Sequence, residues 1–115
     1  MAYSEFLADR VRQRLSKQIF IEKKMMGGLI FMVNEKMCIG VDTDRKSCHD
    51  RLMVRVRKNA YENLLKKKGC REMDFTGKPM KGFLFIYQEG FDNEMDLDFW
   101  VNKALEFNKE SKKSK

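Results

Sequence analysis

The sequence predicts a single α+β domain: an antiparallel sheet with helices in the order α-β-β-β-β-α-β-β-α. Two observations favour this fold. Apolar residues recur at helical spacing near both ends of the chain, over about 3–15 and 97–108. Between them, residues 29–33 and 37–41 are apolar segments joined by a short polar turn, which is the pattern of a β-hairpin.

The first helix is predicted at the N-terminus, where Ser4 is placed to begin it. Its apolar residues recur every four positions and are Tyr3, Leu7, Val11 and Leu15. A strand starts within 19–22, and Gly27 and Gly28 interrupt the chain before the apolar segment 29–33. Because that segment has no polar face, it is predicted to be a central strand.

Two further strands are predicted at 37–41 and 52–56, joined by an exposed polar loop over 42–50. In the second of these strands the apolar residues alternate with polar ones, so Arg55 should face away from them. The apolar residues are Leu52, Val54 and Val56. This pattern is typical of a half-buried strand.

The second half of the chain is predicted to contain a short helix and two strands. Asn59 and Glu62 have the spacing of a capping box, and Gly69 is placed to end this helix. The strands follow at 72–75 and 82–87.

The last helix is predicted to start at Asp92 or Asn93. Acidic residues fill its first turns, where the positive end of the helix dipole favours them. Residues 89–108 carry six acids against one lysine, a net −5, whereas residues 1–88 carry a net +9. The domain is predicted to span 1–108, and 109–115 should form a flexible Lys-rich tail.

Composition indicates a globular protein, with 43% apolar and 36% charged residues. No apolar run reaches the roughly 20 residues needed to cross a membrane, and the start of the chain has no signal-peptide pattern. Cys38, Cys48 and Cys70 are odd in number and form no C-x-x-C pair, which favours reduced thiols. We therefore expect a cytoplasmic protein without membrane contact.

Candidate chemical sites lack the spacing that their chemistry requires. Cys38, Cys48, His49 and Cys70 could make a Cys₃His zinc set, but structural zinc ligands usually occur in closely spaced pairs. A cysteine nucleophile needs a positioned base, and His49 directly follows Cys48 in a polar loop. The sequence therefore predicts no enzyme activity, no metal and no cofactor.

The segment MDFTGKPMKGF at 73–83 mixes apolar and basic residues around glycines and the single proline. Such a loop suits a defined shape or a contact, and it contains no nucleophile or imidazole.

Four segments closely resemble the TfoX (Sxy) N-terminal domain family: KKMMGGLIFMVNEKMCIGV at 23–41, LMVRV at 52–56, MDFTGKPMKGF at 73–83 and LDFWV at 97–101. The resemblance extends from about Met1 to Asn108, with Met26 at a position where the family often has Phe. It implies a secretion-chaperone-like α+β architecture and a link to competence and transformation, with no enzymatic activity. Full-length regulators of the family carry a C-terminal domain, where this chain has its lysine tail.

The leading hypothesis is a non-enzymatic protein-interaction or regulatory domain, acting as a monomer or homodimer on a protein of unknown identity. We refer to its expected site as the predicted contact surface, which comprises Lys24, Met25, Gly27, Gly28, Gly77, Lys78, Pro79, Met80, Lys81 and Gly82. Among these, Gly77, Pro79 and Gly82 should set the backbone shape, and Lys78, Met80 and Lys81 should meet the partner.

The alternative is a nucleic-acid-binding accessory protein with a dispersed basic face and exposed aromatic side chains. The basic residues are Lys23, Lys24, Arg55, Arg57, Lys58, Lys78 and Lys81.

Overall fold

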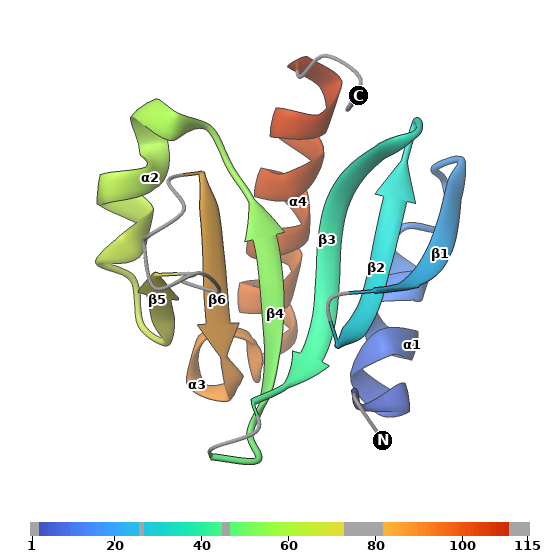
Figure 1. Ribbon diagram of the computed structural model, residues 1–115. Coiled ribbons are helices and arrows are strands. Elements are labelled where there is room, and N and C mark those ends of the chain that lie inside the picture. Colours follow the sequence, from blue (N-terminus) through green and yellow to red (C-terminus); the bar gives the residue numbers. More distant parts are fainter. Residues whose placement is uncertain (1–2, 26, 45–46, 73–81, 111–115) are drawn as a thin grey trace.

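The computed structural model describes residues 3–25, 27–44, 47–72 and 82–110, which form one sheet with helices on one side of it (Figure 1). The elements follow the predicted order, with one short helix added after the last strand. The predicted single-domain α+β fold is confirmed. The last helix runs to Glu110, so the first two residues of the predicted tail are helical.

The described residues form a six-stranded sheet in the order β1-β2-β3-β4-β6-β5, with every neighbouring pair antiparallel. The strands are β1 (Phe20–Met25), β2 (Gly28–Val33), β3 (Lys36–Thr43), β4 (Asp50–Arg55), β5 (Cys70–Glu72) and β6 (Phe83–Tyr87). β1 and β5 are therefore the edges. β2 lies between β1 and β3 and is apolar on both faces, as its unbroken apolar sequence predicted.

The β3–β4 hairpin is longer than predicted, and its loop covers 44–49 instead of 42–50. Asp42 lies opposite Arg51, and Thr43 lies opposite Asp50. Thr43 Oγ1 also donates a hydrogen bond to Asp50 Oδ1 at 3.1 Å. Polar pairs thus extend the ladder, which apolar alternation alone does not reveal.

The helices are α1 (Glu5–Arg14), α2 (Lys58–Leu65), α3 (Gln88–Phe91) and α4 (Glu94–Glu110). Ser4 caps α1 as predicted, because its side chain accepts a hydrogen bond from the Leu7 amide at 3.2 Å. Asn93 caps α4 by accepting from the Asp96 amide at 2.8 Å.

The predicted capping box of α2 is wrong. The helix begins at Lys58 after Arg57, which makes no side-chain capping bond, so Asn59 falls inside the first turn. The cause is the sheet: the Val56 amide still bonds to the Gly82 carbonyl at 2.8 Å, and the chain turns immediately afterwards. β5 also starts two residues earlier than predicted, and residues 73–75 of the predicted strand lie outside the described part.

The main core fills the space between the sheet and the helices. All four helices contribute buried side chains to it: Leu7 and Val11 from α1, Tyr61 from α2, Phe91 from α3, and Leu97 and Trp100 from α4. Leu52, Val54 and Val56 face this core, as predicted for their strand. The helices therefore cover one face of the sheet (Figure 1).

Candidate functional site

The sheet face opposite the helices, called here the open face, carries a smaller apolar cluster. Ile30, Met53 and Phe85 are buried on it, and four half-buried residues pack beside them: Met32, Met37, Phe83 and Tyr87. No helix of the described residues contributes to this cluster. Ile30 and Met53 fold over Gly40, where an added Cβ would lie 2.7 Å and 3.0 Å from their terminal carbons. Because Gly40 of β3 has no side chain, the Ile30 and Met53 side chains can pack over the backbone at this position.

Aromatic rings alternate along β6 on the open face, at Phe83, Phe85 and Tyr87. Guanidinium groups of neighbouring strands lie over them. The distance from Cζ to the ring centroid is 3.7 Å for Arg51 and Phe85, and 5.2 Å for Arg71 and Tyr87.

Arg55 extends this arrangement to the far end of β4. Its Cζ lies 5.7 Å from the ring centroid of Phe83 and 4.8 Å from that of Phe107 on α4. Such cation–π contacts are worth about 0.5–1 kcal/mol each where water reaches them.

Arg51 is the most firmly held of these arginines. Its Nε and Nη2 donate to the two carboxylate oxygens of Asp42 at 2.8 Å and 3.1 Å, and its Nη1 donates to Tyr87 Oη at 3.1 Å. Burial disfavours its charge, but the bonds to Asp42 and Tyr87 outweigh burial and raise the pKa of Arg51. Arg51 therefore holds Asp42, Phe85 and Tyr87 together, and its charge is balanced by the Asp42 carboxylate.

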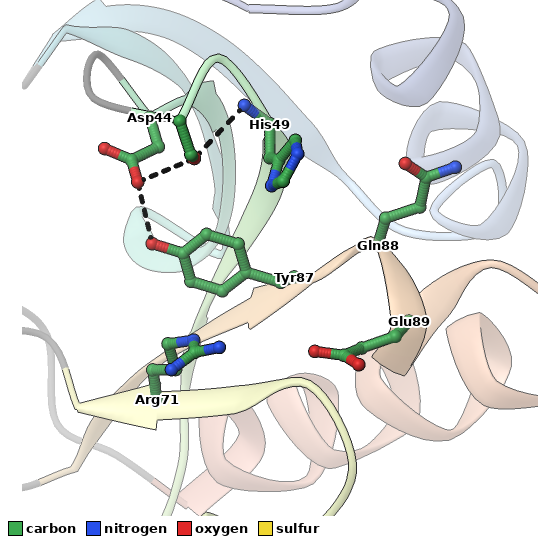
Figure 2. A pocket seen from close by; sticks show the side chains of 7 residues that line it. Asp44, His49, Arg71, Tyr87, Gln88 and Glu89 are labelled. Atoms are coloured by element: carbon green, nitrogen blue, oxygen red, sulfur yellow. Dashed lines mark hydrogen bonds between the residues drawn. The ribbon is translucent and has the colours of Figure 1, made fainter.

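An open pocket of about 560 Å³ lies at the Tyr87 end of the open face (Figure 2). Its lining comes from the β3–β4 loop, β5, β6 and α3 and comprises Asp44, Ser47, His49, Arg71, Tyr87, Gln88 and Glu89. Tyr87 Oη donates to Asp44 Oδ2 at 3.1 Å, and Ser47 Oγ donates to the same oxygen at 2.9 Å. These hydrogen bonds connect the β3–β4 loop to β6, and they engage the Tyr87 hydroxyl and the Asp44 carboxylate inside the protein.

The three cysteines are free thiols and lie in different surroundings. Burial raises the pKa of Cys38 to about 12 and that of Cys70 to about 12. Cys48 is exposed. In the part of the chain that the structure describes, no group of three or more His, Cys, Asp or Glu side chains is placed to hold a metal ion.

The structure describes half of the predicted contact surface. Lys24 is exposed and Met25 ends β1, while Gly27 lies in the turn and Gly28 is the first residue of β2. Both glycines have a structural cause: Gly27 has φ +77°, and a Cβ on Gly28 would lie 2.4 Å from the Val41 carbonyl oxygen. Residues 77–81 lie outside the described residues.

Gly82 lies far from this hairpin. Register places Gly28 beside Asp42, level with Arg51 and Tyr87, whereas Gly82 precedes the other end of β6. Three strand spacings and about five residues along the strands separate them, or roughly 20 Å. The sheet therefore does not bring the two described parts of the predicted contact surface together.

The predicted basic residues also divide between surfaces. Arg55 lies over the open-face ring of Phe83, and Lys23 lies opposite the open-face residue Ile30, whereas Lys24 lies opposite the core residue Leu29. Arg57 and Lys58 are exposed at the start of α2.

Sequence reasoning missed Arg51, Arg71 and the alternating rings of β6. The signal was present, because FLFIY repeats an aromatic residue at every second position. Because the residues between the aromatic ones are also apolar, the segment showed no alternation between an apolar and a polar face.

None of the described helices is both long and apolar enough to cross a membrane. The TfoX N-terminal domain family model matches residues 18–108, from just before β1 almost to the end of α4. This match begins after α1, whereas the resemblance was traced from about Met1. No curated protein and no solved structure matches the chain. With most of its length matched, the chain belongs to the TfoX N-terminal domain family.

Proposed function

We propose that this chain is a regulatory domain of the competence-regulator type that works in the cytoplasm by binding another protein. Family membership supports this proposal, because the TfoX N-terminal domain is a competence- and transformation-regulator-like domain and is not a known enzyme family. Three free thiols suit a reducing compartment.

A binding role also fits the state of the reactive groups. Two of the thiols are held with a pKa of about 12, so they stay protonated and weakly nucleophilic near neutral pH. In the pocket, Tyr87 and Asp44 hydrogen-bond to each other. Their polar atoms stabilise the loop, and this use favours a structural role for them over proton transfer to a substrate.

The observation that carries the proposal is the exposed edge strand β1. Among the described residues β1 pairs with β2 alone, and two large apolar side chains beside this edge face solvent: Ile19 is 84% exposed and Ile21 is 53% exposed. The Ile19 carbonyl accepts from Asn34, next to β2. Strand alternation then directs the amides and carbonyls of Phe20, Glu22 and Lys24 outward.

An unpaired edge with exposed apolar residues can add a strand from another protein. Lys23 and Lys24 on β1 favour an acidic extended segment and oppose pairing between two copies of β1. The described part of the predicted contact surface, at Lys24 and Met25, belongs to this same edge. The proposed partner is therefore a different protein with an extended segment of alternating apolar and acidic residues.

A short peptide of alternating valine and glutamate tests this interaction by NMR. We expect slower amide hydrogen exchange at Phe20, Glu22 and Lys24 when the peptide is added. An Ile19→Ser/Ile21→Ser variant should bind at least tenfold more weakly. Met95→Ser is the matched control, because Met95 is 82% exposed but lies on α4.

Unchanged binding by the double serine variant, or protection of amides elsewhere on the sheet, would contradict the edge-strand site. Residues 77–82 of the predicted contact surface remain in the proposal as a second contact. Replacing Met80 and Lys81 with alanine should weaken capture of a partner protein and leave the melting temperature unchanged.

A further inference from the structure

We propose that the open face binds single-stranded nucleic acid along the strip formed by the rings of β6 and the guanidinium groups over them. This strip follows β6, whereas the proposed protein-binding edge is β1 at the other side of the sheet, so the inference goes beyond the proposed protein-binding role. Three aromatic levels are present, at Phe83, Phe85 and Tyr87, and an arginine lies over each ring.

The spacing of the strip suits successive bases of an extended strand. Residues at alternate positions of a strand lie about 6.8 Å apart on one face. Sheet surfaces that bind single strands place aromatic rings or guanidinium planes at such positions, because every base offers a face for stacking. Phe83 and Tyr87 are half-buried, whereas Phe85 is buried and lies beneath Arg51. The accessible stacking groups are therefore the two outer rings and the arginines.

Charge supports a polyanion as the occupant. Arg51 is neutralised by Asp42, but Arg55 and Arg71 have no ion pair with any described residue. Lys23, which is exposed, adds a third cation on the same face. By contrast, Arg10, Arg12 and Arg14 of α1 are all paired with carboxylates. The open face therefore offers cations that are free to meet phosphates, whereas the arginines of α1 do not.

The strip ends at the pocket beside Tyr87, and this pocket could hold the last base of a bound strand. Arg71 and Tyr87 belong both to the strip and to the pocket, and His49 and Gln88 also line the pocket (Figure 2). Its volume of about 560 Å³ lies within the range of small-molecule sites and accommodates one unstacked base. Gln88 and His49 supply hydrogen-bonding groups at its wall.

Unpaired bases are required by this geometry. Stacking on a sheet needs base faces that a duplex keeps covered, and none of the helices that the structure describes projects from the open face to enter a groove. The contacts are to phosphates and base faces, so binding should depend little on sequence.

Fluorescence anisotropy with labelled 12-mers of oligo-dT and oligo-U, a duplex of equal length and a poly-glutamate peptide tests the proposal. We expect the single strands to bind at least tenfold more tightly than the duplex and the peptide. Three cationic contacts predict a slope of about −2 for log K against log salt concentration, at roughly −0.7 per contact.

Variants then locate the surface. Arg55→Met/Arg71→Met should reduce affinity at least tenfold. The control Lys17→Met/Lys109→Met removes the same charge outside the sheet and should change affinity less than twofold. Tyr87→Phe should keep binding because it keeps the ring, whereas Tyr87→Leu should lose it. Amide NMR spectra and melting temperatures establish that each variant is folded.

Equal losses in the two double variants would mean general charge attraction and would overturn the strip. Duplex binding as tight as that of single strands would also overturn it, as would tight poly-glutamate binding that depends on Arg55 and Arg71. Absence of binding to any oligonucleotide at low salt rejects this inference alone. The edge-strand proposal has its own probe, and its variant replaces Ile19 and Ile21, which the strip does not use, so its success or failure is read independently.

Discussion

The guanidinium of Arg51 lies over the ring of Phe85, with Cζ 3.7 Å from the ring centroid, while its nitrogens hold both carboxylate oxygens of Asp42. Both partners of this ion pair are largely shielded, with 13% of each side chain exposed. One arginine thus joins β3, β4 and β6 across the open face.

Arg51→Met should lower the free energy of unfolding by about 2–3 kcal/mol, because it leaves the Asp42 carboxylate shielded and unpaired. Asp42→Asn should cost less, and the double variant should lose less than the sum of the two. Denaturant unfolding of all three variants measures this coupling. Lys103→Met is the surface control, because its pair with Glu106 is exposed and should contribute less than about 0.5 kcal/mol. Additive losses would show that the pair is not coupled.

Gly69 should tolerate alanine far less well than Gly27. Both glycines have a positive φ, +78° and +77°, which costs an L-residue about 1–2 kcal/mol. A Cβ on Gly69 would also lie 2.6 Å from the Gly90 amide nitrogen, whereas a Cβ on Gly27 meets nothing within 4 Å. We expect a loss of at least about 3 kcal/mol for Gly69→Ala and about 1 kcal/mol for Gly27→Ala. Thermal unfolding compares them, and equal losses would mean that the contact with Gly90 relaxes freely.

Local sequence signals predicted the elements whose cause is local. Ser4 begins α1, and the apolar segment 29–33 is a strand between two others. Gly69 does not end α2 as predicted, because the helix stops at Leu65 with Lys66 as its C-cap, and Gly69 lies in the turn before β5. Asn59 failed because its helix start is set by a bond from Val56 to Gly82, which are distant in sequence. A capping pattern in the sequence does not show at which residue strand pairing ends and the helix can begin.

The open-face arginines were hidden for a related reason. Arg51 precedes the strand that the sequence predicted, and Arg71 follows a helix, so neither looked like part of a surface. Pairing of β4 and β5 with β6 places both beside the aromatic rings. Which strands become neighbours depends on long-range packing. A single sequence does not reveal this strand order, so it could not place Arg51 and Arg71 beside β6.

The thiols should make stability fall at alkaline pH. Burial raises the pKa of Cys38 and of Cys70 to about 12, above the ordinary 9.0 of the unfolded chain. The unfolded state then loses its protons first, so the free energy of unfolding should decrease as pH rises from about 9 to 12. Denaturant unfolding across this range should show a shallower decrease in Cys38→Ala/Cys70→Ala. At pH 8 a thiol reagent should label exposed Cys48 rapidly and the other two slowly. An unchanged slope in the alanine variant would contradict the assignment.

Glu94 should stabilise the protein only above its acidic titration. The acids that begin α4 do more than complement its dipole, because Glu94 accepts hydrogen bonds from Arg10 and Arg14 of α1, and Asp98 pairs with Arg14 at 2.5 Å. The Arg14 bond lowers the pKa of Glu94 below 4.5. A lowered pKa contributes stability above the unfolded value, and this contribution is lost as pH falls through the folded value.

Glu94→Gln should therefore reduce the melting temperature slightly at pH 7, and the difference from the parent chain should shrink as pH falls below 4.5 and the carboxylate becomes protonated. High salt should shrink the effect, since Glu94 is exposed. Glu106→Gln is the matched control: it removes one carboxylate of α4 that pairs within the helix, with Lys103. Because that pair does not reach α1, its removal should have a smaller effect. Equal effects of the two substitutions would mean that the contacts between α1 and α4 do not depend on these charges.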